Sequence, residues 1–337
     1  MSDSFFSLGA QALLKEENRL VKLNQLLDWS QVAKVLKGVN VRDLNGDKRG
    51  RPPYEALKMF KAILLGQWHN LSDPELSRCL KLRIDFMLFC GFDLIDNFPD
   101  DTTLCRFRNR LIALNKSQIL FAEINRQLEQ QGLRINTAQG AVIDATLVET
   151  AARANKYIDG DIPQDRQEDQ SNDDPNVIYC KDKDARWIKK GKQSILGFKA
   201  FTSVDSRHGF IQAIHVTPAN TYEGNQLAEM IDHVQSTDIY ADKGYAQASN
   251  RQLLNLYGKK DRIMNKAARG KPLTYWAKLR NKLISKKRYI VEQCFGTLKR
   301  LYGMSRASYF GLEKVTGQLH FKSMCYNLQK AINMMPN

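Results

Sequence analysis

The sequence predicts an α/β protein in which an all-helical N-terminal domain precedes a domain built on a mixed β-sheet. Three observations support this prediction. Apolar residues recur at helical spacing through most of residues 10–131. From residue 140 onward, short β-rich segments alternate with helical ones. A chain of 337 residues with 43% hydrophobic residues is also long enough to form two cores.

The N-terminal region is expected to be a series of helices. Leucines at helical spacing predict a helix over residues 10–28. Pro52 and Pro53 suit the first turn of a second helix, since proline is favoured there. Ser72, with Glu75 three residues later, predicts a capping box at the start of a third helix.

A further helix of this region begins at Asp100 or Asp101 and carries several arginines, among them Arg106 and Arg108. Successive short helices with basic residues suit a helix-turn-helix-like DNA reader. A plain packing or dimerisation domain has the same pattern. We therefore expect residues 1–135 to be a helical DNA-binding or assembly domain, with both roles open.

The first β-rich segment has an acid at its centre. Residues 140–148 read GAVIDATLV, which is typical of a buried strand, yet Asp144 lies in the middle. Burying an ionised carboxylate is costly unless it is paired or bound to a cation. Asp144 is therefore a candidate metal ligand, and the alternative is an aspartate at a strand end that faces solvent.

The next stretch is polar and acidic and predicts an insertion over about residues 151–192. After it, the patterns predict strands over 195–204, 210–216, 237–241 and 262–265 and helices over 223–234 and 246–257. Asp242 directly follows one of these strands, and Gly244 allows a tight turn after it. A second acid therefore stands at the end of a strand.

The charge of the chain indicates its partner. The formal net charge is +15, and the excess is concentrated in residues 259–288, where Tyr275 and Trp276 are interleaved with lysines and arginines. Basic residues with interleaved aromatic ones are typical of nucleic-acid binding. A solvated lysine-rich face is the alternative reading.

Residues 286–300 read KKRYIVEQCFGTLKR and predict a helix with one acid in a basic surround. At ~100° per residue, Arg288, Glu292 and Lys299 lie within roughly 40° of one another. Apolar residues occupy another arc, which would pack on the protein. Taken alone, this pattern fits a surface helix with ion pairs. Taken together with Asp144 and Asp242, it fits part of a functional site.

Asp144, Asp242 and Glu292 are far apart in the sequence, but strand and helix order allow them to meet at one edge of the sheet. Carboxylates that converge repel one another unless divalent cations bind between them, and hard oxygen ligands select Mg²⁺ or Mn²⁺. Two such ions ~3.5–4 Å apart stabilise an in-line displacement at phosphorus. The residues therefore suggest two-metal phosphoryl transfer on nucleic acid.

Other classes are disfavoured. The six cysteines form no CxxC pair and the five histidines have no ligand spacing, so neither a disulfide framework nor structural zinc is expected. The N-terminus lacks the basic region of a signal peptide, and no apolar run is long enough to span a bilayer. We expect a cytoplasmic protein.

Several motifs together resemble those of one family. They are residues 51–54 (RPPY), 99–108 (PDDTTLCRFR), 144–146 (DAT) and 240–245 (YADKGY), followed by Arg288, Glu292 and Lys299 at the family's arginine–glutamate–lysine spacing. With these motifs in this order, the chain resembles a DDE transposase of bacterial insertion sequences, in the group that includes insertion sequence five. Ser285 stands where that family has a tyrosine.

The resemblance implies a ribonuclease-H-like catalytic domain over residues 136–310, followed by a C-terminal helix within 311–337. It implies that Asp144, Asp242 and Glu292 bind Mg²⁺ or Mn²⁺, as two ions, and catalyse the reaction. The protein would bind the terminal inverted repeats of its element, cleave the DNA ends and join the 3′-hydroxyls to target DNA. It would act in the bacterial nucleoid as a dimer or larger assembly.

The basic residues that we expect to contact DNA are Arg288, Lys299, Lys286, Lys287, Lys243, Arg51, Arg106 and Arg108. Two rival functions remain. A related nuclease or junction resolvase would cut DNA without joining it, and a strand-transfer assay with precut ends distinguishes the two. A DNA-binding protein without catalysis is the third, although the presence of all three acids argues against it.

Overall fold

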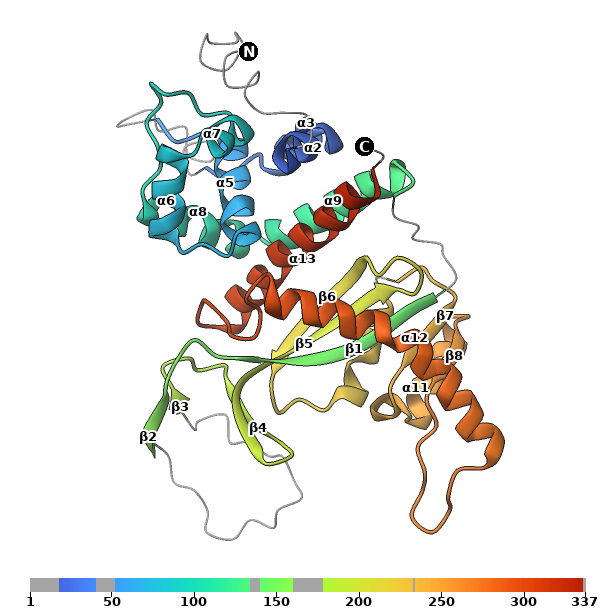
Figure 1. Cartoon of the computed structure of the whole chain (residues 1–337). Helices are drawn as coiled ribbons and strands as arrows, with labels where there is room; N and C mark the ends of the chain where they lie inside the picture. Colours follow the sequence, from blue (N-terminus) through green and yellow to red (C-terminus); the bar gives the residue numbers. More distant parts are fainter. Residues whose placement is uncertain (1–17, 41–51, 134–139, 160–177, 233, 336–337) are drawn as a thin grey trace. The chain divides into compact units, whose positions relative to one another are not determined.

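The structure is a computed structural model that describes residues 18–40, 52–133, 140–159, 178–232 and 234–335 (Figure 1). The chain divides into two compact units. The first consists of Met1–Arg134 and His320–Asn337, and the second of Ile135–Leu319. The start of the helix expected over residues 10–28, and Arg51, lie outside the described residues.

Every element described within Met1–Arg134 is a helix. These helices are α2 (Arg19–Leu26), α3 (Trp29–Val35), α5 (Ala56–Trp68), α6 (Asp73–Leu82), α7 (Ile84–Cys90), α8 (Asp101–Ala113) and α9 (Lys116–Gln130). The predicted capping box is confirmed, because the Ser72 hydroxyl accepts the Glu75 amide and the Glu75 carboxylate accepts the Ser72 amide. The prediction for Pro52 and Pro53 is wrong, because α5 begins only at Ala56.

The last helix, α13 (Leu312–Met334), is the C-terminal helix expected within residues 311–337, and from His320 onward it belongs to the first unit. This part of α13 is buried, and the side chains from His320 to Leu328 are hidden from solvent. Cys325 contacts the carbonyl oxygen of Leu64 on α5 at 3.5 Å. The long apolar face of α13 therefore completes the core of the N-terminal helices.

The second unit is built on a mixed six-stranded sheet with the order β4-β5-β1-β7-β8, in which β6 also pairs with β5 (Figure 1). The strands are β1 (Gly140–Glu149), β4 (Arg186–Lys190), β5 (Gln193–Asp205), β6 (Ile211–Pro218), β7 (Asp238–Ala241) and β8 (Lys260–Ile263). Strands β4, β5, β6 and β1 are antiparallel to their neighbours in that group, and β7 and β8 run parallel to β1. The mixed sheet that the sequence predicts is thus present.

Helices cover both faces of this sheet. On one face, Ile143 and Phe201 belong to a buried cluster with residues of α10 (Leu227–Ile231) and α11 (Ala248–Leu256), and a 3₁₀-helix, η1 (Glu223–Gln226), precedes α10. Side chains alternate along a strand, so the neighbouring residue on β1 points to the opposite face. The long helix α12 (Tyr275–Arg300) crosses that face (Figure 1).

The region predicted as a polar insertion contains more regular structure than expected. Strands β2 (Ala154–Asp159) and β3 (Ile178–Cys180) form a small sheet, and β4 extends the main sheet at its edge. Strand β4 reads RWIKK and keeps several side chains exposed, so its pattern resembles a polar loop. An edge strand of this kind needs little apolar surface, because only one of its sides is paired.

Candidate functional site

The register of the sheet places two of the predicted acids side by side. Strands β1 and β7 are parallel, and their last registered pair is Ile143 opposite Ala241. Asp144 is the next residue of β1 and Asp242 directly follows the end of β7, and neighbouring strands lie about 4.8 Å apart. The structure therefore brings Asp144 and Asp242 together, as the sequence predicts.

The sheet opens at this point. Strand β7 ends at Ala241, whereas β1 continues to Glu149, where Arg306 forms an isolated parallel bridge with it. The chain after β7 turns away as a 3₁₀-helix, η2 (Lys243–Tyr245), and the Asp242 carboxylate accepts the amide hydrogen of Lys243 at 2.5 Å. The carboxyl end of a parallel strand beside such an opening is a common position for a ligand site.

Arg288 on α12 bridges the two acids. Its Nη2 donates to Oδ2 of Asp144 at 2.6 Å, and its Nη1 lies 3.6 Å from Oδ1 of Asp242. The exposed fractions of the side chains are 12% for Arg288, 16% for Asp144 and 33% for Asp242. One cation therefore faces two carboxylates in a partly dehydrated site, where charge interactions are stronger than in water.

Burial controls the protonation of Asp144. It raises the pKa of Asp144 above its ordinary value, because the charged form loses water, and the charge of Asp242 acts in the same direction. Arg288 and the amide of Ala145, which donates to Oδ1 at 2.9 Å, oppose this rise in the pKa. The pKa of Asp144 is thus set by burial on one side and by Arg288 on the other.

Glu292, the third predicted acid, lies one helical turn after Arg288 on α12, and its side chain is exposed. In the part of the chain that the structure describes, no three histidine, cysteine or acidic side chains are grouped closely enough to hold a metal ion. The expected meeting of all three acids is therefore not seen. Arg288 takes the position between Asp144 and Asp242 instead.

Lys299 lies further along the same helix, next to different residues. Burial lowers its pKa, the nearby Lys190 lowers it too, and Glu149 at the end of β1 raises it. Eleven residues of helix and five of strand both span about 16 Å. Helix α12 therefore follows β1 in the same direction, with Arg288 at one end of the contact and Lys299 at the other.

Three residues near the two aspartates did not stand out in the sequence. Tyr245 on η2 is fully buried, and its hydroxyl has no hydrogen-bond partner within the described residues. Burial raises the pKa of Tyr245 well above its ordinary value, and the negative charges of Asp144 and Glu223 raise it further. Glu223 itself pairs with the buried Lys199 at 3.4 Å.

No local pattern marks Glu223 or Lys199, because their proximity depends on how η1 folds back beside β5. Tyr245 could have been found from its position three residues after Asp242. The site is thus surrounded by more charge than the three expected acids supply.

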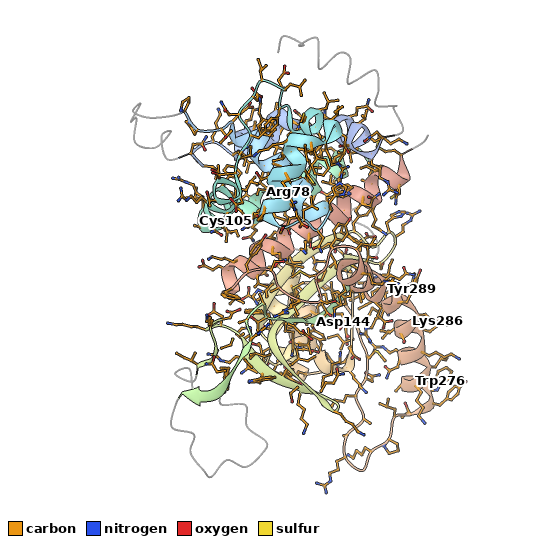
Figure 2. The ribbon with its side chains drawn as sticks, turned by 60° about the vertical axis from the view of Figure 1, so that its left-hand side comes forward. Arg78, Cys105, Asp144, Trp276, Lys286 and Tyr289 are labelled. Atoms are coloured by element: carbon orange, nitrogen blue, oxygen red, sulfur yellow. The ribbon has the colours of Figure 1, made fainter. Side chains whose placement is uncertain are left out.

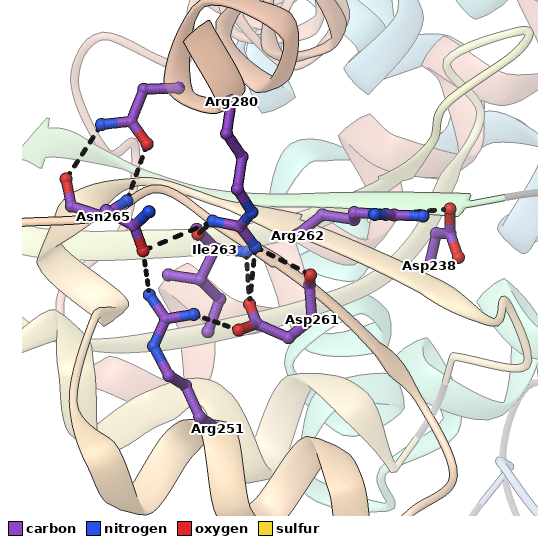
Figure 3. A network of polar contacts seen from close by, with 8 residues as sticks. Asp238, Arg251, Asp261, Arg262, Ile263, Asn265 and Arg280 are labelled. Atoms are coloured by element: carbon purple, nitrogen blue, oxygen red, sulfur yellow. Dashed lines mark hydrogen bonds and ion pairs between the residues drawn. The ribbon is translucent and has the colours of Figure 1, made fainter. Parts of the chain in front are cut away.

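A polar network fixes α12 to the sheet (Figure 3). Arg280 of α12 donates to the carbonyl oxygens of Asp261 and Ile263 at 2.9 and 2.6 Å. Arg251 of α11 reaches the Asp261 carboxylate and also Asn265. The network lies two helical turns before Arg288, so it sets the position from which Arg288 reaches the acids.

The predicted DNA contacts differ in their exposure. Lys243, Lys286, Lys287 and Arg106 are exposed, and Lys299 is half-buried. Trp276, Lys286 and Tyr289 lie along α12 (Figure 2), and both aromatic side chains are largely exposed.

Arg108 corrects one prediction. Its side chain is 2% exposed and pairs with Asp73 at 2.5 Å. The guanidinium ties α8 to the start of α6, so it is a structural residue rather than a DNA contact. The helical spacing of the arginines on α8 could not tell which of them point into the core.

None of the six cysteines forms a disulfide bond in the part of the chain that the structure describes. In the described residues, no helix has both the length and the apolar character needed to span a bilayer.

The comparisons with known proteins agree with this geometry. Residues 136–328 match the family model described as "Transposase DDE domain", and residues 9–110 match the one described as "Transposase domain (DUF772)". The first match alone covers more than half of the chain, so the protein belongs to the DDE transposase family. It is an enzyme that cleaves DNA and transfers strands, and the family depends on divalent metal ions.

A relative supports the assignment along most of the chain. The transposase for insertion sequence element IS1106 from Neisseria meningitidis serogroup B is 41% identical over 284 residues. The alignment covers 84% of this chain and 93% of that protein. No solved structure matches the chain.

Proposed function

We propose that this transposase binds the terminal inverted repeats of its own insertion sequence, cleaves the DNA ends and joins the 3′-hydroxyls to target DNA. The single observation that carries the proposal is the register of β1 and β7. It sets Asp144 and Asp242 next to each other where the sheet opens, with a cationic helix alongside. This arrangement supports a ribonuclease-H-like catalytic domain.

The residues present fit divalent cations. The carboxylates of Asp144, in the middle of β1, and of Asp242, directly after β7, already share one positive charge, that of Arg288. Carboxylate oxygens are ligands that Mg²⁺ and Mn²⁺ prefer. Asp144, Asp242 and Glu292 would hold the metal, with two ions in the complete site. When bound, the ions activate the attacking oxygen and stabilise the leaving oxygen at phosphorus.

The cationic side chains have separate roles in this proposal. Lys243 directly follows Asp242, and Lys286 and Lys287 directly precede Arg288, so each can hold a phosphate of the DNA backbone near the acids. Lys299 would contact the backbone further along α12. The same site would serve cleavage and joining, because both are displacements at phosphorus.

We further propose that residues 1–135 supply DNA binding or assembly and that at least two protomers hold the two ends of the element. Exposed Arg106 on α8 supports a basic surface there. Arg51 is also proposed to contact DNA, although it lies outside the described residues.

A joining assay tests the proposal. Purified protein is incubated with Mg²⁺, a supercoiled target plasmid and a precut duplex that ends in the terminal sequence flanking the gene. We expect the duplex to become covalently attached to the plasmid through its 3′-hydroxyl. A duplex with a 3′-deoxy end is the matched control, because it lacks the nucleophile. Cleavage of uncut ends without any joining would instead indicate a nuclease.

A further inference from the structure

The contacts of Arg288 are few for a side chain so well buried. A guanidinium has five N–H donors. In the described residues, Nη2 makes one short bond to Asp144, Nη1 lies 3.8 Å from the Met264 sulfur and 3.6 Å from Asp242, and Nε is buried without a partner. A buried donor without a partner costs free energy. The position of the guanidinium therefore offers it nearby negative charge but few hydrogen-bond acceptors.

The same carboxylates are the ones that the proposed function assigns to the metal. A divalent cation and a guanidinium both need the oxygens of Asp144 and Asp242, and they repel each other at close range. Asp144 lies on β1 and Asp242 directly follows the paired strand β7, so the sheet holds their backbones side by side. The movable partner is the Arg288 side chain on α12.

We propose that Arg288 competes with the divalent cation for Asp144 and Asp242, so that the cation binds only when the guanidinium moves away. This inference rests on the proposed function, because it takes the two aspartates as metal ligands. It adds that metal binding and the Arg288 bridge between the two aspartates exclude each other. The released guanidinium becomes available to a backbone phosphate, for which its planar fork is well suited.

The position of Glu292 supports an exchange. Residues four apart on a helix lie on neighbouring turns of the same face, so Glu292 follows Arg288 along the acids. Its exposed carboxylate has no part in the bridge between Asp144 and Asp242. Departure of the guanidinium frees the oxygens of Asp144 and Asp242, and Glu292 is the acidic residue next to Arg288 on that face of α12. Rotation of the Arg288 and Glu292 side chains of α12 would then replace the guanidinium beside the two aspartates with a third carboxylate.

Binding of Mn²⁺ to the full-length protein without DNA tests the competition. The electron paramagnetic resonance signal of free Mn²⁺ reports binding, with no need for catalysis. We expect Arg288→Gln to bind Mn²⁺ at least about tenfold more tightly than the wild type. Arg300→Gln is the matched control, since it makes the same change at an exposed position about 18 Å further along α12. Its affinity should stay within about twofold of the wild type.

Asp144→Asn separates the inference from the proposed function. If this variant loses Mn²⁺ binding but Arg288→Gln binds no more tightly than the wild type, the competition is refuted and the metal site stands. If Asp144→Asn binds Mn²⁺ like the wild type, the metal assignment itself is refuted, and the inference with it. Should Arg288→Gln fail to fold, Arg288→Met removes the charge but keeps a long unbranched side chain. Unchanged affinity in that variant would also overturn the competition.

Discussion

Nη2 of Arg288 donates a hydrogen bond to Oδ2 of Asp144 at 2.6 Å, although the two residues are 144 positions apart in the chain. The bond joins the central strand of the sheet to the helix that carries the third predicted acid. It places α12 next to Asp144. It also shows which cation faces the acids in this structure.

Tyr245→Phe should keep the fold and raise its stability. The Tyr245 hydroxyl is buried without a partner in the described residues, and such a group costs about 1–3 kcal/mol. We expect the variant to be about 1 kcal/mol more stable in urea unfolding. A loss of stability of that size would show that the hydroxyl has a partner, such as an ordered water.

Stability in the first unit should depend on pH through His320. Burial lowers the pKa of His320 from 6.5 to about 4. The unfolded chain therefore binds a proton between these values and the folded chain does not, so stability falls as the pH drops from 6.5 towards 4. The change amounts to at most about 3 kcal/mol.

His320→Gln should flatten this dependence, because glutamine does not titrate. Urea unfolding at pH 7.5 and pH 5, followed in the wild type and the variant, measures the difference. His208→Gln is the comparison, since it makes the same change at a half-buried histidine in the turn before β6. Equal slopes in the wild type and His320→Gln would contradict the account.

Two arginines on α8 should behave in opposite ways. Arg106 is exposed, so Arg106→Gln should weaken DNA binding and reduce the slope of log affinity against log salt by about one. Arg108 is buried against Asp73, so Arg108→Gln should lower stability by roughly 3 kcal/mol and leave that slope unchanged. Fluorescence anisotropy with a DNA duplex at several salt concentrations gives the slopes. A reduced slope in folded Arg108→Gln would refute its structural role.

The lysines of α12 should contribute phosphate contacts near the acids. The double variant Lys286→Gln/Lys287→Gln should bind duplex DNA more weakly and reduce the salt slope by about two, because each phosphate contact releases close to one counterion. The same anisotropy titration measures it. An unchanged slope would show that these exposed lysines face solvent in the complex.

The strands and the two aspartates could be predicted from local patterns, and the reason is physical. A run such as GAVIDATLV carries both its β-propensity and the anomaly of a buried acid within nine residues. The strands at 195–204, 210–216 and 237–241 are confirmed within two residues at each end. Strand β8 begins at Lys260, two residues early, because its first residues are charged and resemble a loop.

The contacts of side chains at long range could not be predicted in this way. Helical spacing put Arg288, Glu292 and Lys299 on one face but could not assign Arg288 to Asp144 or Lys299 to the neighbourhood of Glu149. The burial of Arg108 depends on α6, and the edge strand β4 depends on β5. Each of these features is decided by an element elsewhere in the chain.

The assignment of the catalytic acids is the central claim, and cleavage of a duplex that carries one end of the element tests it most directly. Asp144→Asn, Asp242→Asn and Glu292→Gln are compared with Glu313→Gln, which changes an exposed glutamate at the start of α13. Even the loss of an outer partner of a metal ligand costs roughly 10- to 100-fold. The account predicts that the first three variants lose at least about a hundredfold in Mg²⁺-dependent cleavage while still binding the duplex, and that Glu313→Gln cleaves like the wild type. Full cleavage by any one of the three would contradict the assignment of that residue.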